Sequence, residues 1–200
     1  MLDEKRYWFQ KIEKIVGKIF SFFPFHPNDY TLFSVFLAFF SFYFLSQKKI
    51  ILSLLFFLIS AFCDFIDGAV ARYKNVSTKK GAYLDTICDR YVEGFLLLGM
   101  IFLPLPKIIF PSVFWIFLIF FGGMMTTYAK AAAKEKELTI VELKGGFLSR
   151  GERMLLLILS LFLGIFNLFW MSYLLIIIAI LTNITALQRI KTALKNQNSY

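Results

Sequence analysis

Residues 64–89 read DFIDGAVARYKNVSTKKGAYLDTICD, and the four aspartates in this stretch constrain how the chain can fold. Asp64 and Asp67 close one strongly apolar run, and Asp85 and Asp89 open the next. An ionised group close to the hydrocarbon of a bilayer is costly unless it is paired or hydrated. These carboxylates therefore require a counterion.

The spacing of the four aspartates fits two neighbouring helices that share one ion. Asp64 and Asp67 are three positions apart and Asp85 and Asp89 are four apart, so each pair lies on one face of a helix. Antiparallel helices joined by a short loop bring the pairs together. Four carboxylates without a His or Cys cluster form a hard oxygen site that suits Mg²⁺, Mn²⁺ or Ca²⁺ rather than zinc. Such ions favour phosphate chemistry, because they neutralise the charge that develops on transfer.

The composition places this site in a membrane protein. Apolar residues make up 58% of the 200 positions, against roughly 45–50% in soluble domains. A helix needs about 20 predominantly apolar residues to cross a bilayer. Charge clusters, Pro and Gly divide the chain into six predicted spans, at residues 30–45, 50–72, 81–103, 111–130, 153–169 and 171–187.

The segment before the first span has a different character. Residues 1–20 mix lysines and acids with apolar residues at helical spacing, which predicts an amphipathic helix in the membrane interface; a soluble helix is the alternative. We therefore expect an all-α integral membrane protein with one domain over residues 1–200. Residues 1–20 form its interfacial helix, and residues 30–187 form a bundle of six transmembrane helices.

The distribution of positive charge predicts the topology. The net charge of +9 is typical of some nucleic-acid-binding proteins, but here most Lys and Arg residues fall in alternate loops between the spans. If the N-terminus is cytoplasmic, only Lys48, Lys49 and Lys107 lie outside. Both termini and the aspartates are then on the cytoplasmic side of the cell membrane. A small cation transporter is an alternative function, but it would place carboxylates near the bilayer midplane rather than at one edge.

The run from Asp64 to Asp89 matches without a gap the pattern D-x2-D-G-x2-A-R-x8-G-x3-D-x3-D, and so resembles the signature of the CDP-alcohol phosphotransferase family. The six-span layout and the entry Pro27-Asn28-x-x-Thr31 to the first span are also similar to that family. The resemblance implies transfer of a phosphoalcohol from a CDP-alcohol to an acceptor hydroxyl, with release of CMP and with Mg²⁺ or Mn²⁺, as two divalent ions, as cofactor. It also implies a homodimer.

The resemblance also implies roles for the motif residues. Asp64, Asp67 and Asp85 bind metal, and Asp89 is counted with them in the metal site and also takes the proton of the acceptor hydroxyl. The small residues Gly68, Ala71 and Gly81 leave a slot for the cytidine ring, although Gly68 and Gly81 are alternatively helix-packing glycines. Arg72 holds the diphosphate through its fork of donors. The residues expected to contact CDP are Thr31, Asp64, Gly68, Ala71, Arg72 and Gly81.

The acceptor and the lipid are less constrained by the sequence. A basic segment at residues 128–153, on the side of the aspartates, and Arg189 resemble the acceptor-phosphate pocket of the phosphatidylinositol-phosphate and archaetidylinositol-phosphate synthase branch. By that resemblance Lys130, Arg153 and Arg189 clamp the phosphate of a phosphorylated polyol, inositol 1-phosphate, and the donor is a CDP-linked membrane lipid carrying a phosphatidyl or archaetidyl group. Glycerol 3-phosphate or another alcohol is the alternative acceptor. Alternatively, these basic residues only follow the topology rule for cytoplasmic loops, an interpretation that covers Lys134, Lys144, Arg150, Arg153 and Arg189.

Overall fold

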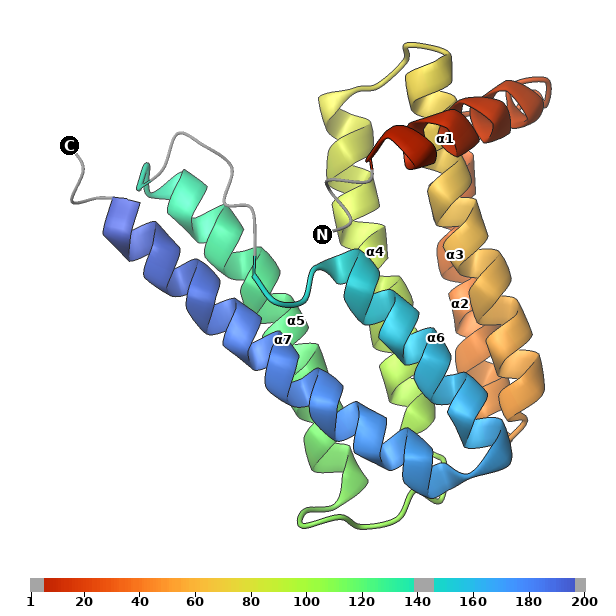
Figure 1. Ribbon diagram of the computed structural model, residues 1–200. Helices are drawn as coiled ribbons and strands as arrows, with labels where there is room; N and C mark the ends of the chain where they lie inside the picture. The colour runs from red at the N-terminus through yellow and green to blue at the C-terminus, as the bar shows by residue number, and fades with distance from the viewer. Residues whose placement is uncertain (1–5, 139–145, 197–200) are drawn as a thin grey trace.

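The computed structural model describes residues 6–138 and 146–196, and these residues form seven helices (Figure 1). The predicted all-α fold is confirmed, with boundaries a few residues from those expected. The helices are α1 (Arg6–Phe20), α2 (Pro27–Ser46), α3 (Ile50–Tyr73), α4 (Lys79–Met100), α5 (Ser112–Glu135), α6 (Arg150–Phe166) and α7 (Leu168–Asn196).

Four of these helices, α2, α3, α5 and α7, are long and apolar enough to cross a membrane. The sequence predicted six spans, and the two others correspond to α4 and α6. Helix α4 is less apolar because Asp85, Asp89, Arg90 and Glu93 lie within it. Helix α6 has only 17 residues, which is about 26 Å of helix. Multi-pass character is therefore clear from the four long helices alone.

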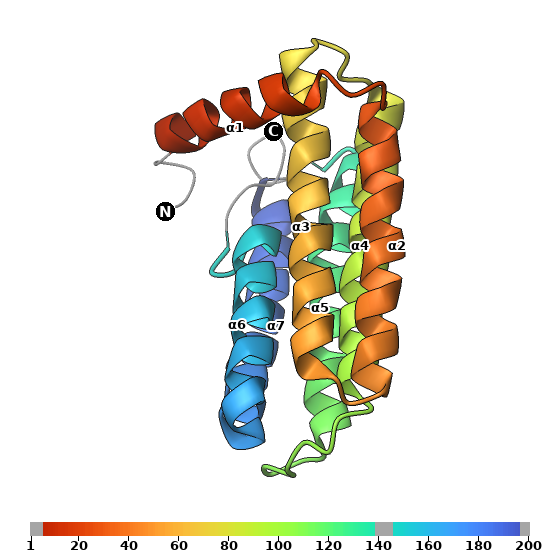
Figure 2. The same ribbon diagram turned by 90° about the vertical axis from the view of Figure 1, so that its right-hand side faces the viewer.

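The helices pack in two groups. Helix α2 lies against both α3 and α4, while α7 lies against both α5 and α6; contacts of α3 with α6 and of α4 with α5 join the groups. From α2 to α7 consecutive helices alternate in direction, so the C-terminal ends of α3, α5 and α7 lie at the same end of the bundle as the N-terminal ends of α4 and α6 (Figure 1). Helix α1 crosses this end and packs against α3 (Figure 2).

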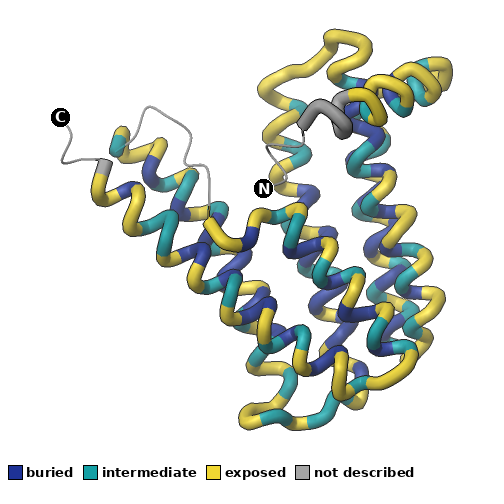
Figure 3. Tube along the Cα trace, in the orientation of Figure 1, coloured by how far each residue is buried: buried dark blue, intermediate teal, exposed yellow. Residues whose placement is uncertain are grey.

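Apolar side chains fill the seams between helices and also cover the outer surface. Leu45, Phe57 and Leu96 are fully buried in the first group, as are Leu157 and Ile178 in the second. The outward faces of the helices are exposed and rich in Phe (Figure 3). Because lipid tails are as apolar as these side chains, the exposed faces are compatible with a bilayer, and helix association depends on close packing.

Close packing is visible where α4 meets α2. A Cβ at Gly99 would lie 2.9 Å from the side chain of Leu45, so a larger residue would force the helices apart. Hydrogen bonds between small side chains join α2 to α3. The Ser41 and Ser53 hydroxyls lie 2.7 Å apart, and the Ser60 hydroxyl donates to the Ser34 carbonyl at 2.7 Å. These contacts fix α3 and α4, which carry the aspartates, relative to one another through α2.

The connection from α6 to α7 lies earlier in the chain than predicted. The fifth span was expected to reach residue 169, but α6 ends at Phe166 and α7 begins at Leu168. Asn167 is extended, and its side-chain oxygen accepts a hydrogen bond from the Phe169 backbone N–H at 2.8 Å. This bond supplies a partner for one of the backbone donors left without one at the start of a helix.

Candidate active site

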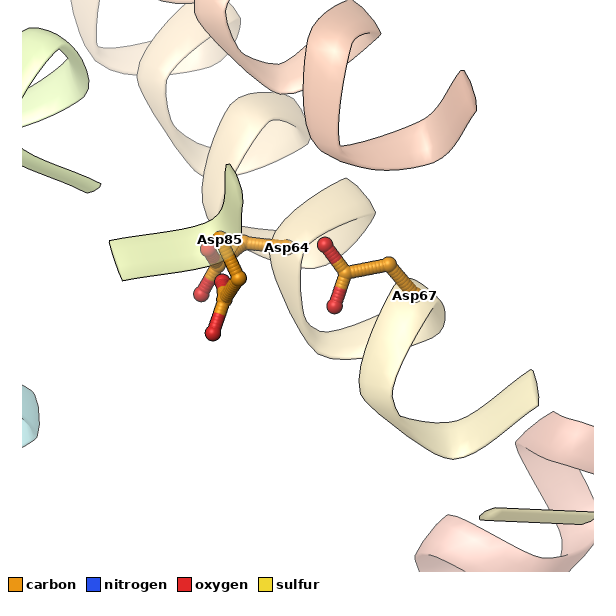
Figure 4. Close-up of side chains that lie close together, drawn as sticks. All are labelled: Asp64, Asp67 and Asp85. Atoms are coloured by element: carbon orange, nitrogen blue, oxygen red, sulfur yellow. The ribbon is translucent and has the colours of Figure 1, made fainter. Parts of the chain in front are cut away.

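Three of the four aspartates form a compact group of carboxylates. Asp64 and Asp67 lie one turn apart on α3, and Asp85 faces them from α4 (Figure 4). One carboxylate oxygen from each lies within 4.8 Å of the other two. Asp67 is buried, whereas Asp64 and Asp85 are half-buried. Three carboxylates at this distance repel one another, and they fit a hard divalent cation that accepts oxygen ligands.

Neighbouring hydroxyls support this geometry. Thr31, buried on α2, donates a hydrogen bond of 2.5 Å to Asp67 Oδ2 and so fixes the orientation of that carboxylate. The Thr78 hydroxyl caps the start of α4 by accepting a hydrogen bond from the Gly81 backbone N–H at 3.0 Å. This cap starts the helix at the position that brings Asp85 opposite α3.

Asp89 lies one turn beyond Asp85 on α4 and is joined to the group by an arginine. Its buried carboxylate forms an ion pair with Arg150, the first residue of α6. Arg150 Nη2 is also 3.4 Å from Asp64 Oδ1. The four aspartates are therefore together, as their spacing predicted, with three forming the tight group and the fourth beside it.

A cavity of about 400 Å³ opens next to the carboxylates, between α2, α3 and α4. Asp67 and Asp85 form part of its wall. All the residues predicted to contact CDP, except Asp64, also line it: Thr31, Gly68, Ala71, Arg72 and Gly81. A Cβ at Gly81 would lie 3.2 Å from both Asn28 Oδ1 and Thr78 Oγ1, so glycine leaves room at this wall that a larger side chain would take.

Arg72 is the one cation in the wall of this cavity, within the residues that the structure describes. Its guanidinium forms an ion pair with Glu13 of α1, and its side chain remains 59% exposed. Helix α1 approaches closely here, because a Cβ at Gly17 would lie 2.5 Å from the carbonyl oxygen of Ala69. Helix α1 thus contributes a carboxylate that pairs with the arginine in the cavity wall.

The residues predicted to clamp an acceptor phosphate come from three helices. Arg153 of α6 is buried and bonded to Glu93 of α4. Arg189 of α7 donates a hydrogen bond to the Thr126 carbonyl at 3.0 Å. Lys130 is half-buried on α5. Lys144, from the same basic segment, lies outside the described residues.

Comparison with known proteins decides the family. Residues 25–185 match the family model for CDP-alcohol phosphatidyltransferases. The chain belongs to the CDP-alcohol phosphatidyltransferase family. It is therefore a membrane-bound, metal-binding CDP-alcohol phosphotransferase of phospholipid biosynthesis, which confirms the prediction from the motif. The match gives no support to the cation-transporter alternative.

Several named proteins are similar in sequence to this transferase. The archaetidylinositol phosphate synthase of Pyrococcus horikoshii is 30% identical over 188 residues, which cover 93% of this chain and 92% of that protein. A bifunctional IPC transferase and DIPP synthase of Aquifex aeolicus is 30% identical over 146 residues, or 70% of this chain, but the match spans only 32% of that longer protein.

The fold of the transferase also matches a solved structure. The phosphatidylinositol phosphate synthase of Mycobacterium tuberculosis, crystallised with manganese and citrate, aligns with a TM-score of 0.78 and 21% identity, covering 91% of this chain and 88% of that one. The same synthase with bound CDP-DAG gives a TM-score of 0.77 at 21% identity, with 92% and 94% covered. At this identity the likeness establishes a shared membrane fold.

Two charged residues of the transferase were not recognised from the sequence. From the sequence, Arg150 is expected only to follow the topology rule or to join a general anion site, yet it contacts Asp64 and Asp89. Glu93 has no predicted role, yet it is 2% exposed and binds Arg153. A signal was present, because Arg150 is three positions before Arg153 and Asp89 four before Glu93, so each pair shares a helix face.

Proposed function

We propose that this transferase moves a lipid phosphoryl group from a CDP-lipid to a hydroxyl of inositol 1-phosphate and releases CMP. The observation that carries the proposal is the cavity that has Asp67 and Asp85 in its wall. It lets a nucleotide diphosphate lie against the carboxylate group while the lipid tails stay in the membrane. The hydroxyl oxygen of the acceptor attacks the phosphorus that carries the lipid alcohol, the bond from that phosphorus to the oxygen bridging the two phosphates breaks, and CMP leaves with that oxygen.

The carboxylates have distinct tasks in this proposal. Asp64, Asp67 and Asp85 hold the divalent metal, Mg²⁺ or Mn²⁺, as two ions. When bound, the metal neutralises the diphosphate oxygens and the charge that develops on transfer. Asp89 accepts the proton of the acceptor hydroxyl, a task that needs a carboxylate within hydrogen-bond reach of that hydroxyl. Its ion pair with Arg150 fixes the carboxylate next to the metal-binding group.

Nucleotide binding is assigned to the wall of the cavity. Gly68, Ala71 and Gly81 accommodate the cytidine ring, and Thr31 fixes Asp67 beneath it. Arg72 binds the diphosphate. To do so, its guanidinium leaves Glu13 and pairs with a phosphate oxygen.

The acceptor phosphate is assigned to Lys130, Arg153 and Arg189. Support comes from the 30% identity with an archaetidylinositol phosphate synthase over nearly the whole length of both chains. Further support is the gathering of basic side chains beside Asp89, with Arg150 in contact with it and Arg153 one turn further along α6. A phosphorylated acceptor carries the negative charge that such a cluster binds.

The proposed membrane arrangement follows the distribution of charge and apolar residues in the sequence. Helices α4 and α6 complete six spans within a single domain of residues 1–200, and the protein is a homodimer with both termini and the site on the cytoplasmic side. Helix α1 lies in the interface, a position supported by the exposure of its apolar Ile12, Ile15 and Ile19. The alternating helix directions bring α1 and the site-bearing ends of α3, α4 and α6 to one side.

The test is CMP release by the purified enzyme in lipid nanodiscs with Mg²⁺. CDP-diacylglycerol and CDP-archaeol serve as donors, each with inositol 1-phosphate, glycerol 3-phosphate or free inositol, and mass spectrometry identifies the lipid product. We expect turnover with inositol 1-phosphate and an inositol-phosphate lipid as product. Turnover with glycerol 3-phosphate alone would reject the acceptor and leave the CDP-alcohol chemistry intact.

A further inference from the structure

A buried ion pair joins α4 to α6 one turn beyond the site. Glu93 and Arg153 are 2% and 1% exposed. Arg153 donates two hydrogen bonds to the carboxylate, from Nε to Oε1 at 2.5 Å and from Nη2 to Oε2 at 2.9 Å. This parallel, two-bond arrangement fixes the plane of the guanidinium as well as its position.

The pair is enclosed by further polar groups and by a glycine. Arg90 Nη1 lies 3.2 Å from Glu93 Oε2 and 3.4 Å from the Gly123 carbonyl oxygen, to which it donates. A Cβ at Gly123 would lie 3.1 Å from Glu93 Oε1 and 3.2 Å from Arg153 Nη2, so α5 packs on the pair at a position with no side chain. Helices α4, α5 and α6 thus meet at the Glu93 carboxylate and the two guanidinium groups that contact it.

The Glu93–Arg153 pair repeats, one helical turn away, the link that Asp89 and Arg150 make between α4 and α6. Arg150 pairs with Asp89, and Arg153 pairs with Glu93, so the same faces of α6 and α4 are linked twice, one helical turn apart. A buried ion pair is not by itself a good way to stabilise a fold, because removing two charges from water offsets most of their attraction. Here the ion pair fixes the orientation of the Arg153 guanidinium.

We propose that Glu93 is a positioning residue for acceptor binding, which holds the Arg153 guanidinium in the orientation that receives the acceptor phosphate. The inference rests on the proposed function, in which Arg153 binds that phosphate. A guanidinium has five N–H donors, and the bonds to Glu93 use two of them, so Arg153 can bind both partners at once. Glu93 itself does not touch the substrate.

A double-mutant cycle tests the proposal with inositol 1-phosphate and a CDP-lipid. The enzymes are wild type, Glu93→Gln, Arg153→Gln and the double variant, with Glu93→Asp as the conservative change. The matched control is the adjacent Gly94→Ala, where a new Cβ would meet only Phe120 at an ordinary 3.6 Å. We expect Glu93→Gln to raise KM for inositol 1-phosphate about 10-fold while KM for the CDP-lipid stays within about twofold. Glu93→Asp should raise this KM less than Glu93→Gln does. In the Arg153→Gln background, Glu93→Gln should cause no further rise in KM for inositol 1-phosphate.

The outcomes separate this inference from the proposed function. If wild type turns over only unphosphorylated alcohols, the proposed function fails and the role of Glu93 fails with it. If wild type uses inositol 1-phosphate but Glu93→Gln leaves its KM unchanged, the role of Glu93 alone is overturned. Glu93→Gln could instead lower kcat and the melting temperature by the same amount in the wild-type and Arg153→Gln backgrounds. That result would make Glu93 a purely structural residue and would also overturn the proposal.

Discussion

The guanidinium of Arg150 at the start of α6 is paired with the carboxylate of Asp89 in α4, and its Nη2 reaches Asp64 at 3.4 Å. Arg150 therefore bridges Asp64 of α3, one of the three clustered carboxylates, and the proposed base Asp89 of α4. Since α6 contacts α3 and carries Arg150 at its first position, the packing of α6 determines the charge balance of the site.

Loss of the Arg150 charge is expected to impair catalysis strongly. Without it, Asp64 and Asp89 repel each other and the incoming diphosphate, so Arg150→Gln should lower kcat/KM about 100-fold. Arg150→Lys should lose less, because it retains the charge but not the fork of donors. Steady-state CMP release measures both. Gly151→Ala is the control, since nothing lies within 4 Å of a Cβ there; wild-type kinetics in Arg150→Gln would remove this residue from the site.

Replacement of Asp89 separates proton transfer from metal binding. Asp89→Asn keeps the shape but cannot accept the hydroxyl proton, so kcat should fall about 1,000-fold. Mn²⁺ affinity, measured by calorimetry, should fall less than in Asp85→Asn, because Asp85 belongs to the group of three carboxylates. The same change at exposed Glu135, Glu135→Gln, should leave turnover unchanged. An active Asp89→Asn enzyme would show that another group takes the proton.

Gly81 is expected to report on the nucleotide slot. A branched side chain at this wall would crowd Asn28 and Thr78, so Gly81→Val should raise KM for the CDP-lipid about 10-fold and leave KM for the acceptor nearly unchanged. Gly94→Ala, on the same helix but away from the cavity, should behave as wild type. An equal rise in both KM values would indicate that the helices had moved rather than that the slot had narrowed.

The pair between Glu13 and Arg72 predicts a gain of affinity. If Arg72 exchanges Glu13 for the diphosphate, then Glu13→Gln removes the competitor and should lower KM for the CDP-lipid. An exposed ion pair contributes about 0.2–1 kcal/mol, which corresponds to a change of about 1.4- to 5-fold. Lys14→Gln on the same helix serves as control. A higher KM in Glu13→Gln would mean that Glu13 orients Arg72 for binding instead of competing for it.

Much of this site could be predicted from the sequence because its residues are close along the chain. The spacing of Asp64, Asp67, Asp85 and Asp89 fixes their helix faces, and a link of five residues between α3 and α4 leaves only one way to bring them together. The small residues Gly68, Ala71 and Gly81 in the cavity wall belong to the same segment, whereas Thr31 joins them from α2.

The role of Arg150 and Glu93 could not be predicted, because it depends on where α6 lies relative to α4 in the bundle. In sequence, Arg150 resembles any cation at the end of a span, and Glu93 resembles an isolated charge in an apolar helix. Only the position of α6 makes Asp89 and Glu93 their partners. The same limit applies to Arg153, because its spacing from Arg150 indicates a shared helix face but does not indicate which carboxylate that face meets.

Metal removal should abolish turnover reversibly. Without a cation the clustered carboxylates oppose binding of the diphosphate, so chelation by EDTA should bring CMP release to background, and Mg²⁺ or Mn²⁺ should restore it. Zn²⁺ should restore less, because Asp64, Asp67 and Asp85 offer only hard oxygen ligands. Full activity in EDTA would contradict the assignment.

The position of the bound metal tests the account most directly. Crystals of the active enzyme soaked in Mn²⁺, with anomalous data collected on both sides of the manganese absorption edge, would locate the ion independently of any kinetic interpretation. The account predicts manganese peaks between α3 and α4, ligated by Asp64, Asp67 and Asp85. A peak held by other residues, or no peak at these carboxylates in an enzyme that turns over with Mn²⁺, would contradict it.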